Sequence, residues 1–392
     1  MASIFQGDSA PSFGPAQPNP AVAILPPIAQ SIMSVATSPS VIVVGGGIVG
    51  SSIAWHLARE TNVTIVAEEV GGTATPNSFA WINAAYENPK FYYDFRHRSM
   101  AHWHEIADQL PALPIRWGGS VNWNYPPDEL ADYEETWSSW GYDIIRVDRT
   151  EISAREPELA ADFVPDEGVA VGEEGEMEAH IVALQLIADA ELHGARLLDT
   201  TVTGFLKDSN GSVAGVSTAR GDVYADHVVL AAGLGCLPLL AMENITLPIT
   251  GIAGLLINSK PTDKKYLDGV VNADDLHMRQ TADGRIRAGA DFSGGDASGD
   301  PQKTAEELFA KVKEALKAGD ELEYDHYTVG IRPTPQDDIP ILGPTGLDGL
   351  TVAVMHSGVS NGALVGELLT KQILTGASDP ALDDFRLDRF SK

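Results

Sequence analysis

The stretch from Val41 to Glu60 constrains the fold of this chain more than any other part of the sequence. It reads VIVVGGGIVGSSIAWHLARE, so four β-branched residues precede a glycine cluster and an apolar pattern at helical spacing. Four apolar residues in succession are typical of a strand buried on both faces of a parallel sheet. The pattern Gly-x-Gly-x-x-Gly falls on Gly45, Gly47 and Gly50. The sequence therefore predicts a strand, a tight glycine turn and a helix.

The next apolar run completes the pattern of a dinucleotide-binding site. Residues 63–67 predict a second strand that ends at Glu68, roughly 20 residues after the first glycine, as expected for a carboxylate that binds a ribose. In such a turn the second glycine lets the backbone approach a pyrophosphate, and the third lets the helix pack on the strand. The helix then directs its positive N-terminal end at the phosphates. Glu68 favours an unphosphorylated 2′-hydroxyl and hence FAD or NAD.

The composition excludes several classes of function. The chain has 392 residues, of which 55 are acidic and 26 basic, with a net charge of −29. Binding of nucleic acid needs a concentrated basic face, so we expect neither nucleic acid nor an anionic membrane as a partner. Cys236 is the only cysteine, which excludes an internal disulfide and a cysteine-based zinc site. His102 and His104 face different ways on the predicted helix 91–110, and we predict no metal.

Residues 1–40 differ in composition from the rest of the chain. They are rich in Pro, Ala, Ser and Gln, and Asp8 is their only charged residue. This composition predicts a disordered leader. The segment has no arginine or lysine, and its AVAIL run is short and followed by proline, so it fits neither a mitochondrial nor a secretory signal. No apolar run is long enough to span a membrane, and we expect a soluble, cytoplasmic protein.

The remaining sequence distinguishes FAD from NAD. A NAD dehydrogenase usually continues its nucleotide fold without interruption, whereas here the long loop GGTATPNSFAWINAAYENP follows the second strand. Further strands are predicted much later, at 197–202, 213–218, 222–224 and in HVVLAAG. The segment from GIRPTPQDDIPILG to HSGVSNGALVGELLTKQI then predicts two short strands, a glycine turn and a helix.

In this order, the quoted stretches resemble the FAD-dependent D-amino acid oxidase superfamily, which includes sarcosine oxidases, glycine oxidases and D-amino acid dehydrogenases. The resemblance covers roughly residues 41–390 and is most specific in the pattern G-x-R-P-x-x-x-D-x-x-P-x-x-G. It implies an α/β fold with a Rossmann-like FAD-binding domain and a discontinuous α+β substrate domain that has a mostly antiparallel sheet. The implied FAD-binding domain comprises 41–90, 175–245 and 330–392, and the substrate domain comprises 91–174 and 246–329.

The resemblance also implies which residues bind FAD. They are Gly45, Gly47, Gly50 and Glu68 for the ADP half, Ser78 in the long loop, Val202 at the adenine, Ala232 and Gly233 on the pyrophosphate side, and Ser357, Gly358, Val359, Ser360 and Asn361 beside the flavin pyrimidine. The last group also opens the final predicted helix, whose N-terminus would stabilise the negative charge of reduced flavin. Covalent members carry a cysteine where this chain has Gly330 and Ile331, so we predict non-covalent FAD.

The implied reaction is the oxidation of a C–N bond in an amine or amino acid. Hydride passes from the substrate carbon to flavin N5, water hydrolyses the resulting imine, and oxygen or another acceptor reoxidises the flavin. Positioning then supplies most of the catalysis. Arg332 is the first candidate for binding a substrate carboxylate, because a guanidinium can donate two parallel hydrogen bonds to it. The alternative for Arg332 is a surface ion pair with Asp337 or Asp338.

Further side chains are candidates for catalysis or substrate binding. Arg287 occupies the place where sarcosine oxidases have a lysine that assists oxygen, and Arg279 lies on the same predicted hairpin. Both could equally be solvated hairpin charges. His356 precedes the final helix and could approach the flavin or the substrate, or it could be a packed histidine. The aromatic candidates for the pocket wall are Trp81, Tyr86 and Trp123, although such residues more often belong to a core.

Three alternative functions stay open at this stage. The protein could be a dehydrogenase that passes electrons to an acceptor other than oxygen. It could oxidise an amine within a larger metabolite, with Trp81 as one wall of the site. In a different class, it could be an FAD-binding protein with an assembly or binding role, which an absence of arginines at the flavin face would support.

Overall fold

The computed structural model describes residues 38–85, 88–290 and 300–391 of the chain. The segment Ser38–Lys392 is one compact unit. The predicted disordered leader, residues 1–40, lies outside the described residues except for 38–40.

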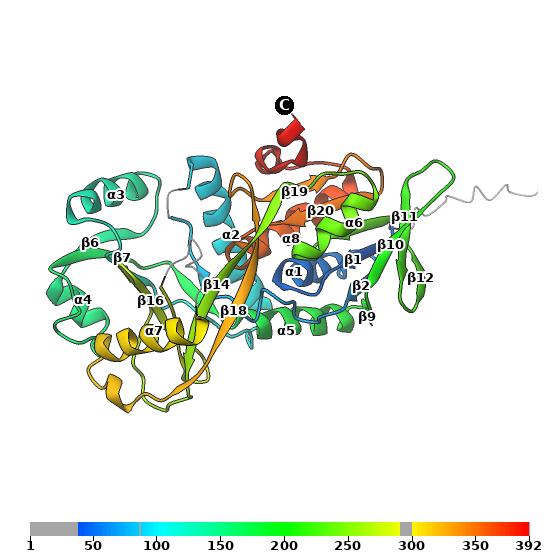
Figure 1. Ribbon diagram of the computed structural model, residues 1–392. Coiled ribbons are helices and arrows are strands. Elements are labelled where there is room, and N and C mark those ends of the chain that lie inside the picture. Colours follow the sequence, from blue (N-terminus) through cyan, green and yellow to red (C-terminus); the bar gives the residue numbers. More distant parts are fainter. Residues whose placement is uncertain (1–37, 86–87, 291–299, 392) are drawn as a thin grey trace, which may run out of the picture. The chain divides into compact units, whose positions relative to one another are not determined.

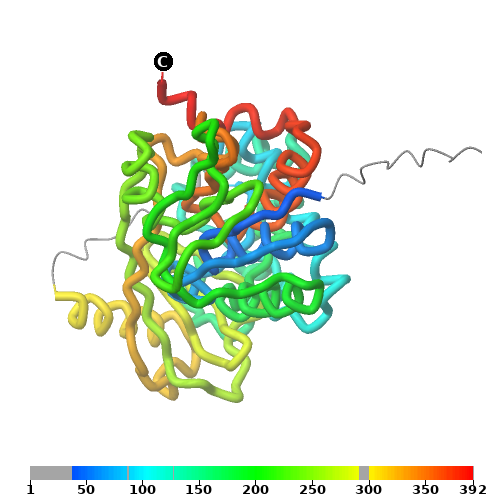
Figure 2. The backbone as a smooth tube through the Cα atoms, turned by 90° about the vertical axis from the view of Figure 1, so that its right-hand side faces the viewer, coloured from blue at the N-terminus to red at the C-terminus, as the bar shows by residue number. Residues whose placement is uncertain are grey.

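The first large sheet, which we call the parallel sheet, has the strand order β19-β20-β13-β1-β2-β9 within the described residues. Its neighbouring strands run parallel except for the pair β19–β20. The strands are β1 (Val41–Val44), β2 (Val63–Ala67), β9 (Arg196–Asp199), β13 (His227–Leu230), β19 (Ile341–Pro344) and β20 (Leu350–Val354). Figure 2 shows the blue strands from the start of this unit beside green segments that come much later in the chain.

The strand β1 shows why both faces of the parallel sheet are buried. Val41 and Val43 belong to one apolar cluster, and Ile42 and Val44 belong to another on the opposite face. The first cluster includes side chains of the helices α1 (Ile48–Leu57), α5 (Ala179–Leu192) and α8 (Gly358–Thr375). The second includes side chains of α6 (Cys236–Met242) and of a smaller sheet formed by β10 (Val202–Lys207), β11 (Val213–Thr218) and β12 (Gly221–Tyr224).

The second large sheet, which we call the antiparallel sheet, has the order β18-β14-β17-β16-β15-β5-β7-β6 within the described residues. Its strands are β5 (Ser120–Asn122), β6 (Ile144–Asp148), β7 (Glu167–Val171), β14 (Ile249–Ser259), β15 (Val270–Ala273), β16 (Leu276–Gln280), β17 (Ile286–Gly289) and β18 (Tyr324–Pro335). Neighbours are antiparallel except β5 and β15. The helices α4 (Arg149–Arg155) and α7 (Pro301–Ala315) pack on one face of it through Ile152, Leu308 and Val312.

The long strands β14 and β18 pair from Ile249 opposite Pro335 to Ser259 opposite Tyr324. Figure 1 shows them as a two-stranded ribbon that runs from the antiparallel sheet toward α1 and α8. Paired residues of antiparallel strands project to the same face. Arg332 pairs with Ile252, and Arg279 on β16 pairs with Arg287 on β17.

Among the described elements, three further strands and two further α-helices belong to neither large sheet. A short sheet joins β3 (Trp81–Ile82), β8 (Gly175–Met177) and β4 (Ile115–Arg116), and the remaining helices are α2 (Lys90–Gln109) and α3 (Pro127–Ser139). None of the helices in the described part of the chain is long and apolar enough to span a membrane.

The predicted fold class is confirmed, and two element lengths are wrong. The apolar spacing of Leu308, Phe309, Val312 and Leu316 predicts a helix over 301–319. The helix ends at Ala315, because Leu316 is extended and bridges to Leu159. The first of the two strands expected near GIRPTP is not short, because β18 begins at Tyr324 and pairs with β14 along its whole length. The proposed division into an FAD-binding and a substrate domain stays a prediction.

Candidate functional site

The glycine turn after β1 has the geometry that a bound pyrophosphate requires. Gly45 has a φ of +113°, and a Cβ there would lie 2.4 Å from the carbonyl oxygen of Ala231. A Cβ on Gly50 would lie 2.1 Å from the carbonyl oxygen of Gly45. Both positions therefore exclude a side chain, which explains the first and third glycines of the motif.

The second glycine, Gly47, is the N-cap of α1 and has no side chain to bond the first turn. The hydroxyl of Thr75 instead accepts a hydrogen bond of 3.1 Å from the Ile48 amide. The chain at Gly72 approaches so closely that a Cβ on Gly72 would lie 2.7 Å from the Gly47 Cα. This bare backbone at a helix N-terminus fits the phosphates of a dinucleotide.

The other predicted ADP-binding residues lie near this turn. Glu68 is exposed and directly follows β2. The amide of Thr200 donates to the carbonyl of Ala67 at 3.1 Å, which brings the chain that leads into Val202 beside Glu68. Ala232 and Gly233 follow β13, whose end is tied to β1 by the hydrogen bond of 2.8 Å from the Ala231 amide to the Val44 carbonyl. The residues present fit the ADP half of FAD.

The N-terminus of α8, residues Ser357–Asn361, meets the N-terminus of α1. A Cβ on Gly358 would lie 2.8 Å from Cγ2 of Val49, so the first turns of the two helices touch. The carbonyl of Val359 accepts a hydrogen bond of 2.8 Å from the indole of Trp103. One extended ligand could therefore contact both helix ends, as FAD would.

A buried guanidinium lies at the N-terminus of α8. Arg96 on α2 is 7% exposed and donates to the Ser357 hydroxyl at 2.8 Å and to the Ser360 hydroxyl at 3.4 Å. It also donates to the Asn83 carbonyl at 3.0 Å and to the Asn83 side chain. Asn361 is fully buried, and its amide donates to the Tyr92 hydroxyl at 3.0 Å. A positive side chain thus adds to the positive end of the helix.

Arg332 lies on the face of β14 and β18 that points toward this helix end. Its guanidinium lies over Gly254, where a Cβ would be only 3.4 Å from Nη2. Nη1 of Arg332 lies 3.2 Å from Nε2 of His356, the residue before the α8 cap. Asp337, one of the two alternative ion-pair partners considered for Arg332, pairs with Arg389 at 2.8 Å. The structure thus brings Arg332 and His356 together at the predicted flavin pyrimidine site.

His356 is exposed in part, yet its surroundings disfavour a charge. The largest cause is the loss of water around the imidazole ring, and the positive charges of Arg332 and Arg96 add to its effect. Together they lower the pKa of His356 from 6.5 to about 4. Arg332 can only donate a hydrogen bond, so Nε2 of His356 must be its acceptor. The ring hydrogen is then on Nδ1, which faces the Ser357 hydroxyl at 3.3 Å.

The antiparallel sheet presents two further arginines to the loop that precedes β3. Arg287 donates to the Ser78 carbonyl at 3.2 Å and to Asn258 at 2.9 Å, and burial, with Arg279 adding, lowers its pKa to about 10. Arg279 is completely buried and donates to the Phe79 carbonyl at 2.6 Å and to Glu178 at 2.8 Å. A guanidinium enclosed in this way has no exposed surface for a substrate, so its position argues against the predicted substrate contact of Arg279.

The same loop has strained backbone beside Trp81. Ala80 has a φ of +63°, a value that an alanine rarely adopts. Its carbonyl accepts a hydrogen bond of 3.1 Å from the Met177 amide, and the Trp81 carbonyl accepts one of 3.3 Å from the Ser360 hydroxyl. The indole of Trp81 is half-buried and packs against Phe79. Trp81 therefore lies between the antiparallel sheet and the N-terminus of α8.

Two aromatic candidates do not join this group. Trp123 is 8% exposed and lies in the core of the antiparallel sheet, with its ring 5.5 Å from that of Phe163. This position argues against the predicted substrate contact, and the ordinary core role explains it. Tyr86 lies outside the described residues.

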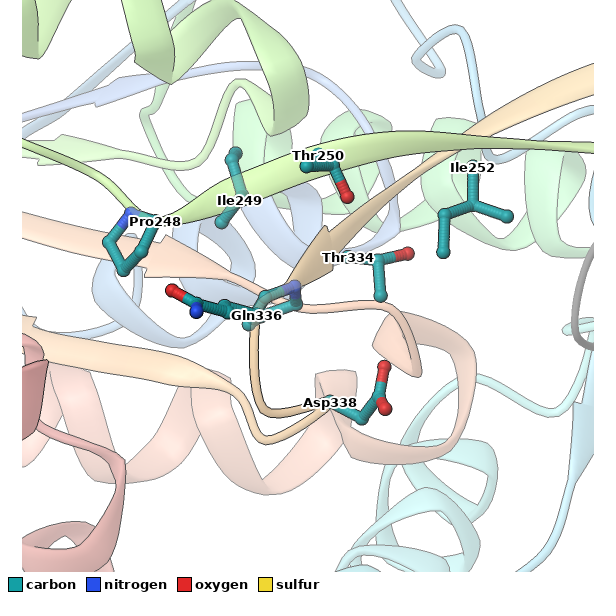
Figure 3. Close-up of a pocket in the computed structure, with 8 residues that line it drawn as sticks. Pro248, Ile249, Thr250, Ile252, Thr334, Gln336 and Asp338 are labelled. Carbon is teal, nitrogen blue, oxygen red and sulfur yellow. The ribbon is translucent and has the colours of Figure 1, made fainter.

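An open pocket of about 330 Å³ extends along the sheet face that carries Arg332. Figure 3 shows Thr250, Ile252 and Thr334 of β14 and β18 around it. Ile252 is the register partner of Arg332, and Thr250 is that of Thr334. The pocket therefore continues the row of side chains to which Arg332 belongs.

Sequence reasoning missed Arg96, Asn83, Glu174 and Tyr142. Arg96 had one available signal, since it lies four residues after Tyr92 on the buried face of its helix. Glu174 had none, because it stands in the run EEGEME, which resembles an exposed acidic turn. The residue is nevertheless only 2% exposed, and its carboxylate accepts a hydrogen bond of 2.9 Å from the Trp81 indole.

The only cysteine of the chain is a core residue with an unreactive thiol. Cys236 begins α6 and is fully buried, and burial raises the pKa of its thiol to about 12. Among the described residues, no group of three or more His, Cys, Asp or Glu side chains could hold a metal ion.

A parallel sheet with a glycine turn for a dinucleotide, joined to an antiparallel sheet that carries arginines, defines a flavin-dependent oxidoreductase. Residues 40–372 match the family described as FAD dependent oxidoreductase, DAO, and the chain belongs to this family. Its cofactor is FAD.

Individual relatives agree with this assignment. The chain is 25% identical to the glycine oxidase of Bacillus subtilis (strain 168) over 376 residues, which covers 89% of this chain and 96% of that protein. Its fold matches the crystal structure of glycine oxidase from Geobacillus kaustophilus with a TM-score of 0.79 at 23% identity, over 90% of this chain and 98% of the other. It also matches L-proline dehydrogenase from P. horikoshii with a TM-score of 0.80 at 21% identity, over 91% and 98% of the two chains.

Proposed function

We propose that this protein oxidises the C–N bond of a small amine that carries a carboxylate, such as an amino acid. The observation that supports this most directly is the position of Arg332, over Gly254 on the sheet face and 3.2 Å from His356 at the N-terminus of α8. A guanidinium there would bind a substrate carboxylate through two hydrogen bonds. The named glycine oxidase relatives support the same class of substrate.

The side chains around Arg332 hold it in one orientation. Gly254 leaves room for the guanidinium to lie flat on the strand. His356 accepts from Nη1, and its other ring nitrogen is directed at the Ser357 hydroxyl. Because the lowered pKa keeps His356 neutral at physiological pH, the ring can accept this bond without repelling the arginine. The cluster therefore presents a fixed positive charge in a strongly acidic protein.

The loop that begins at Ser78 and the N-terminus of α8 form the other predicted flavin contacts. When FAD is bound, its isoalloxazine ring supplies the acceptor for the hydride that leaves the substrate carbon. Arg96 and the first turn of α8 place positive charge at the end of the site where the pyrimidine is predicted to lie. The buried Arg287 stays the candidate for assisting oxygen.

The first experiment is anaerobic bleaching of the flavin absorbance by a panel of amines and amino acids, with both enantiomers, followed by admission of air. We expect bleaching by a carboxylated amine. Rapid return of the absorbance in air would identify an oxidase, and slow return would identify a dehydrogenase with another acceptor. An absence of bleaching by every compound, with FAD bound, would contradict the proposal and favour a larger substrate or a binding role.

The substitution Arg332→Met tests the carboxylate contact. A hydrogen bond to a charged group contributes about 1.5–3 kcal/mol, so kcat/KM for the active compound should fall by roughly 10- to 100-fold. FAD content should not change. Arg389→Met, which removes the surface ion pair with Asp337, serves as the matched control and should leave kcat/KM unaltered. An equal loss for an amine that lacks a carboxylate would refute the assigned role.

A further inference from the structure

The indole of Trp81 lies on the same sheet face as Arg332. It packs against the apolar cluster of Phe79, Leu256 and Val270, and Leu256 is two residues from Gly254 on β14. Alternate residues of a strand project to the same face and are roughly 7 Å apart. Arg332 covers Gly254, so Trp81 and Arg332 occupy adjacent positions on one surface. A substrate whose carboxylate binds Arg332 would have its neighbouring substituent next to this indole.

The carboxylate of the buried Glu174 accepts a hydrogen bond from the Trp81 indole. Oε2 of Glu174 accepts hydrogen bonds from Nε1 of Trp81 at 2.9 Å and from the Ser120 hydroxyl at 2.5 Å. Oε1 accepts from the Tyr142 hydroxyl. The partners come from β3, β5 and the residue pair before β6, so Glu174 joins elements that are distant in the sequence.

The hydrogens of this cluster can be assigned from its partners. An indole nitrogen can only donate. The Tyr142 oxygen accepts from the backbone amide of Ala84 at 3.0 Å, and the Ser120 oxygen accepts from the side-chain amide of Asn122 at 2.9 Å. When Glu174 is ionised it can only accept, so both hydroxyl hydrogens are directed at it and it accepts all three bonds.

Three hydrogen-bond donors and the more distant charge of Arg96 stabilise the ionised form of Glu174. Burial raises the pKa of Glu174 to about 7, and the three donors, together with the charge of Arg96, oppose that rise. A buried carboxylate fixes the orientation of the groups that donate to it. A donor that turned away would lose a charge-assisted hydrogen bond and stay buried without a partner. Trp81 is thus held at its indole nitrogen by Glu174 and at its backbone carbonyl by Ser360.

We propose that Glu174 is a positioning residue that fixes the Trp81 indole as the wall beside the substrate substituent, so that Trp81 limits the size of that substituent. The inference that the indole borders the substrate rests on the proposed function. The inference that Glu174 fixes the indole does not, and the two can be tested separately.

The positioning role is tested by NMR of the FAD-loaded enzyme labelled with ¹⁵N-tryptophan. The chain has 7 tryptophans, and Trp81→Phe identifies the indole signal of Trp81. We expect Glu174→Gln to move that signal upfield, toward the position of a weakly bonded indole. The neighbouring Glu173→Gln, which removes a carboxylate bonded to His97 at 2.8 Å, is the control and should leave it in place. An unmoved Trp81 signal in Glu174→Gln would overturn the proposal.

The size limit is tested by the ratio of kcat/KM for a bulky and a small substrate from the same panel. Trp81→Phe and Glu174→Gln should each raise this ratio at least tenfold, and the double variant should raise it no further. Additive effects would show that Glu174 acts independently of Trp81 and would overturn the proposal. If Glu174→Gln does not fold, Glu174→Asp, which withdraws the carboxylate from the indole by one methylene, must shift the Trp81 signal and the ratio in the same directions.

If no compound bleaches the flavin, the NMR result still decides the positioning role of Glu174. If a substrate is found and the Trp81 signal moves but the ratio does not, the indole is fixed by Glu174 and does not border the substrate. That outcome overturns the size limit and leaves the assignment of Arg332 intact.

Discussion

His356 is a residue whose neighbours select its neutral form. Its pKa is about 4 in the folded protein and 6.5 in an unfolded chain, so the unfolded state binds more protons between these values. The free energy of unfolding therefore falls as the pH is lowered from about 6.5 to 4. His56, with a pKa lowered to about 3, and His227, with one lowered to about 4, act in the same direction.

We predict that His356→Asn makes this loss of stability shallower, because one of the three histidines no longer titrates. Urea unfolding at several pH values between 4 and 7 measures it. His193→Asn is the control, since its side chain is 43% exposed and lies on the surface. Parallel pH profiles for wild type and His356→Asn would show that the lowered pKa does not contribute to stability.

Sequence alone could find the glycines and Arg332, but it could not separate the two tryptophans. Trp81 and Trp123 both stand in alternating apolar runs, yet one lies at the N-terminus of α8 and the other in the core beside Phe163. The contact of Arg96 with Ser357 spans 261 positions. Which buried polar groups meet across such a separation depends on the packing of whole elements, which no local pattern encodes.

At the scale of elements, the close approach of α1 and α8 brings the two helix N-termini together. A Cβ on Gly366 would lie 2.6 Å from the hydroxyl and 2.9 Å from the carbonyl oxygen of Ser52, and 2.5 Å from the His56 ring. Two of these atoms belong to side chains that can shift, whereas the carbonyl belongs to the backbone of α1. A larger residue at this point must therefore separate the helices.

We predict that Gly366→Ala lowers the free energy of unfolding by about 1–3 kcal/mol, the usual cost of overpacking. It should also weaken FAD binding, because it separates the two helix ends that FAD is proposed to contact. Urea unfolding and FAD titration measure the two effects. Gly204→Ala is the matched control, since a Cβ at Gly204 meets no atom within 4 Å. Equal effects of both substitutions would contradict the packing argument.

The elements themselves were predictable where a local pattern was strong. The helix expected at 91–110 is α2, Lys90–Gln109. The hairpin predicted to carry Arg279 and Arg287 has its turn at ADG, residues 282–284, and hydrogen bonds between Thr281 and Arg285 close it. The end of α7 was not predictable, because Leu316 continues the apolar face of the helix while a bridge to Leu159 ends it.

At the scale of the whole molecule, the distribution of charge matters more than its sum. A chain with a net charge of −29 repels both a carboxylate and a diphosphate. Arg96, Arg279, Arg287 and Arg332 come from α2, β16, β17 and β18 and gather around a single loop and helix end. Glu178 neutralises Arg279, whereas Arg332 has the neutral His356 beside it. A need for local arginines could be anticipated from the composition, but their location could not.

FAD should stabilise the entire folded unit by mass action. At a free concentration of 100 times its Kd, a ligand that binds only the folded state adds about 2.7 kcal/mol. For a protein of this size that corresponds to an increase of roughly 3–4 °C in Tm. Thermal unfolding of FAD-depleted protein with added FAD measures it, and NAD at the same concentration is the control. An equal increase with NAD would contradict the selectivity for flavin.

The burial of Cys236 has a practical consequence for attaching labels at a single site of this enzyme. Its thiol is the only one in the chain, is inaccessible, and is almost entirely protonated at neutral pH. Alkylating reagents should therefore leave the native protein unmodified. A cysteine introduced on the exposed side of α5, for example at Leu192, which is 85% exposed, would then be the single reactive position. Fluorophores and spin labels could be attached there without first removing a native residue.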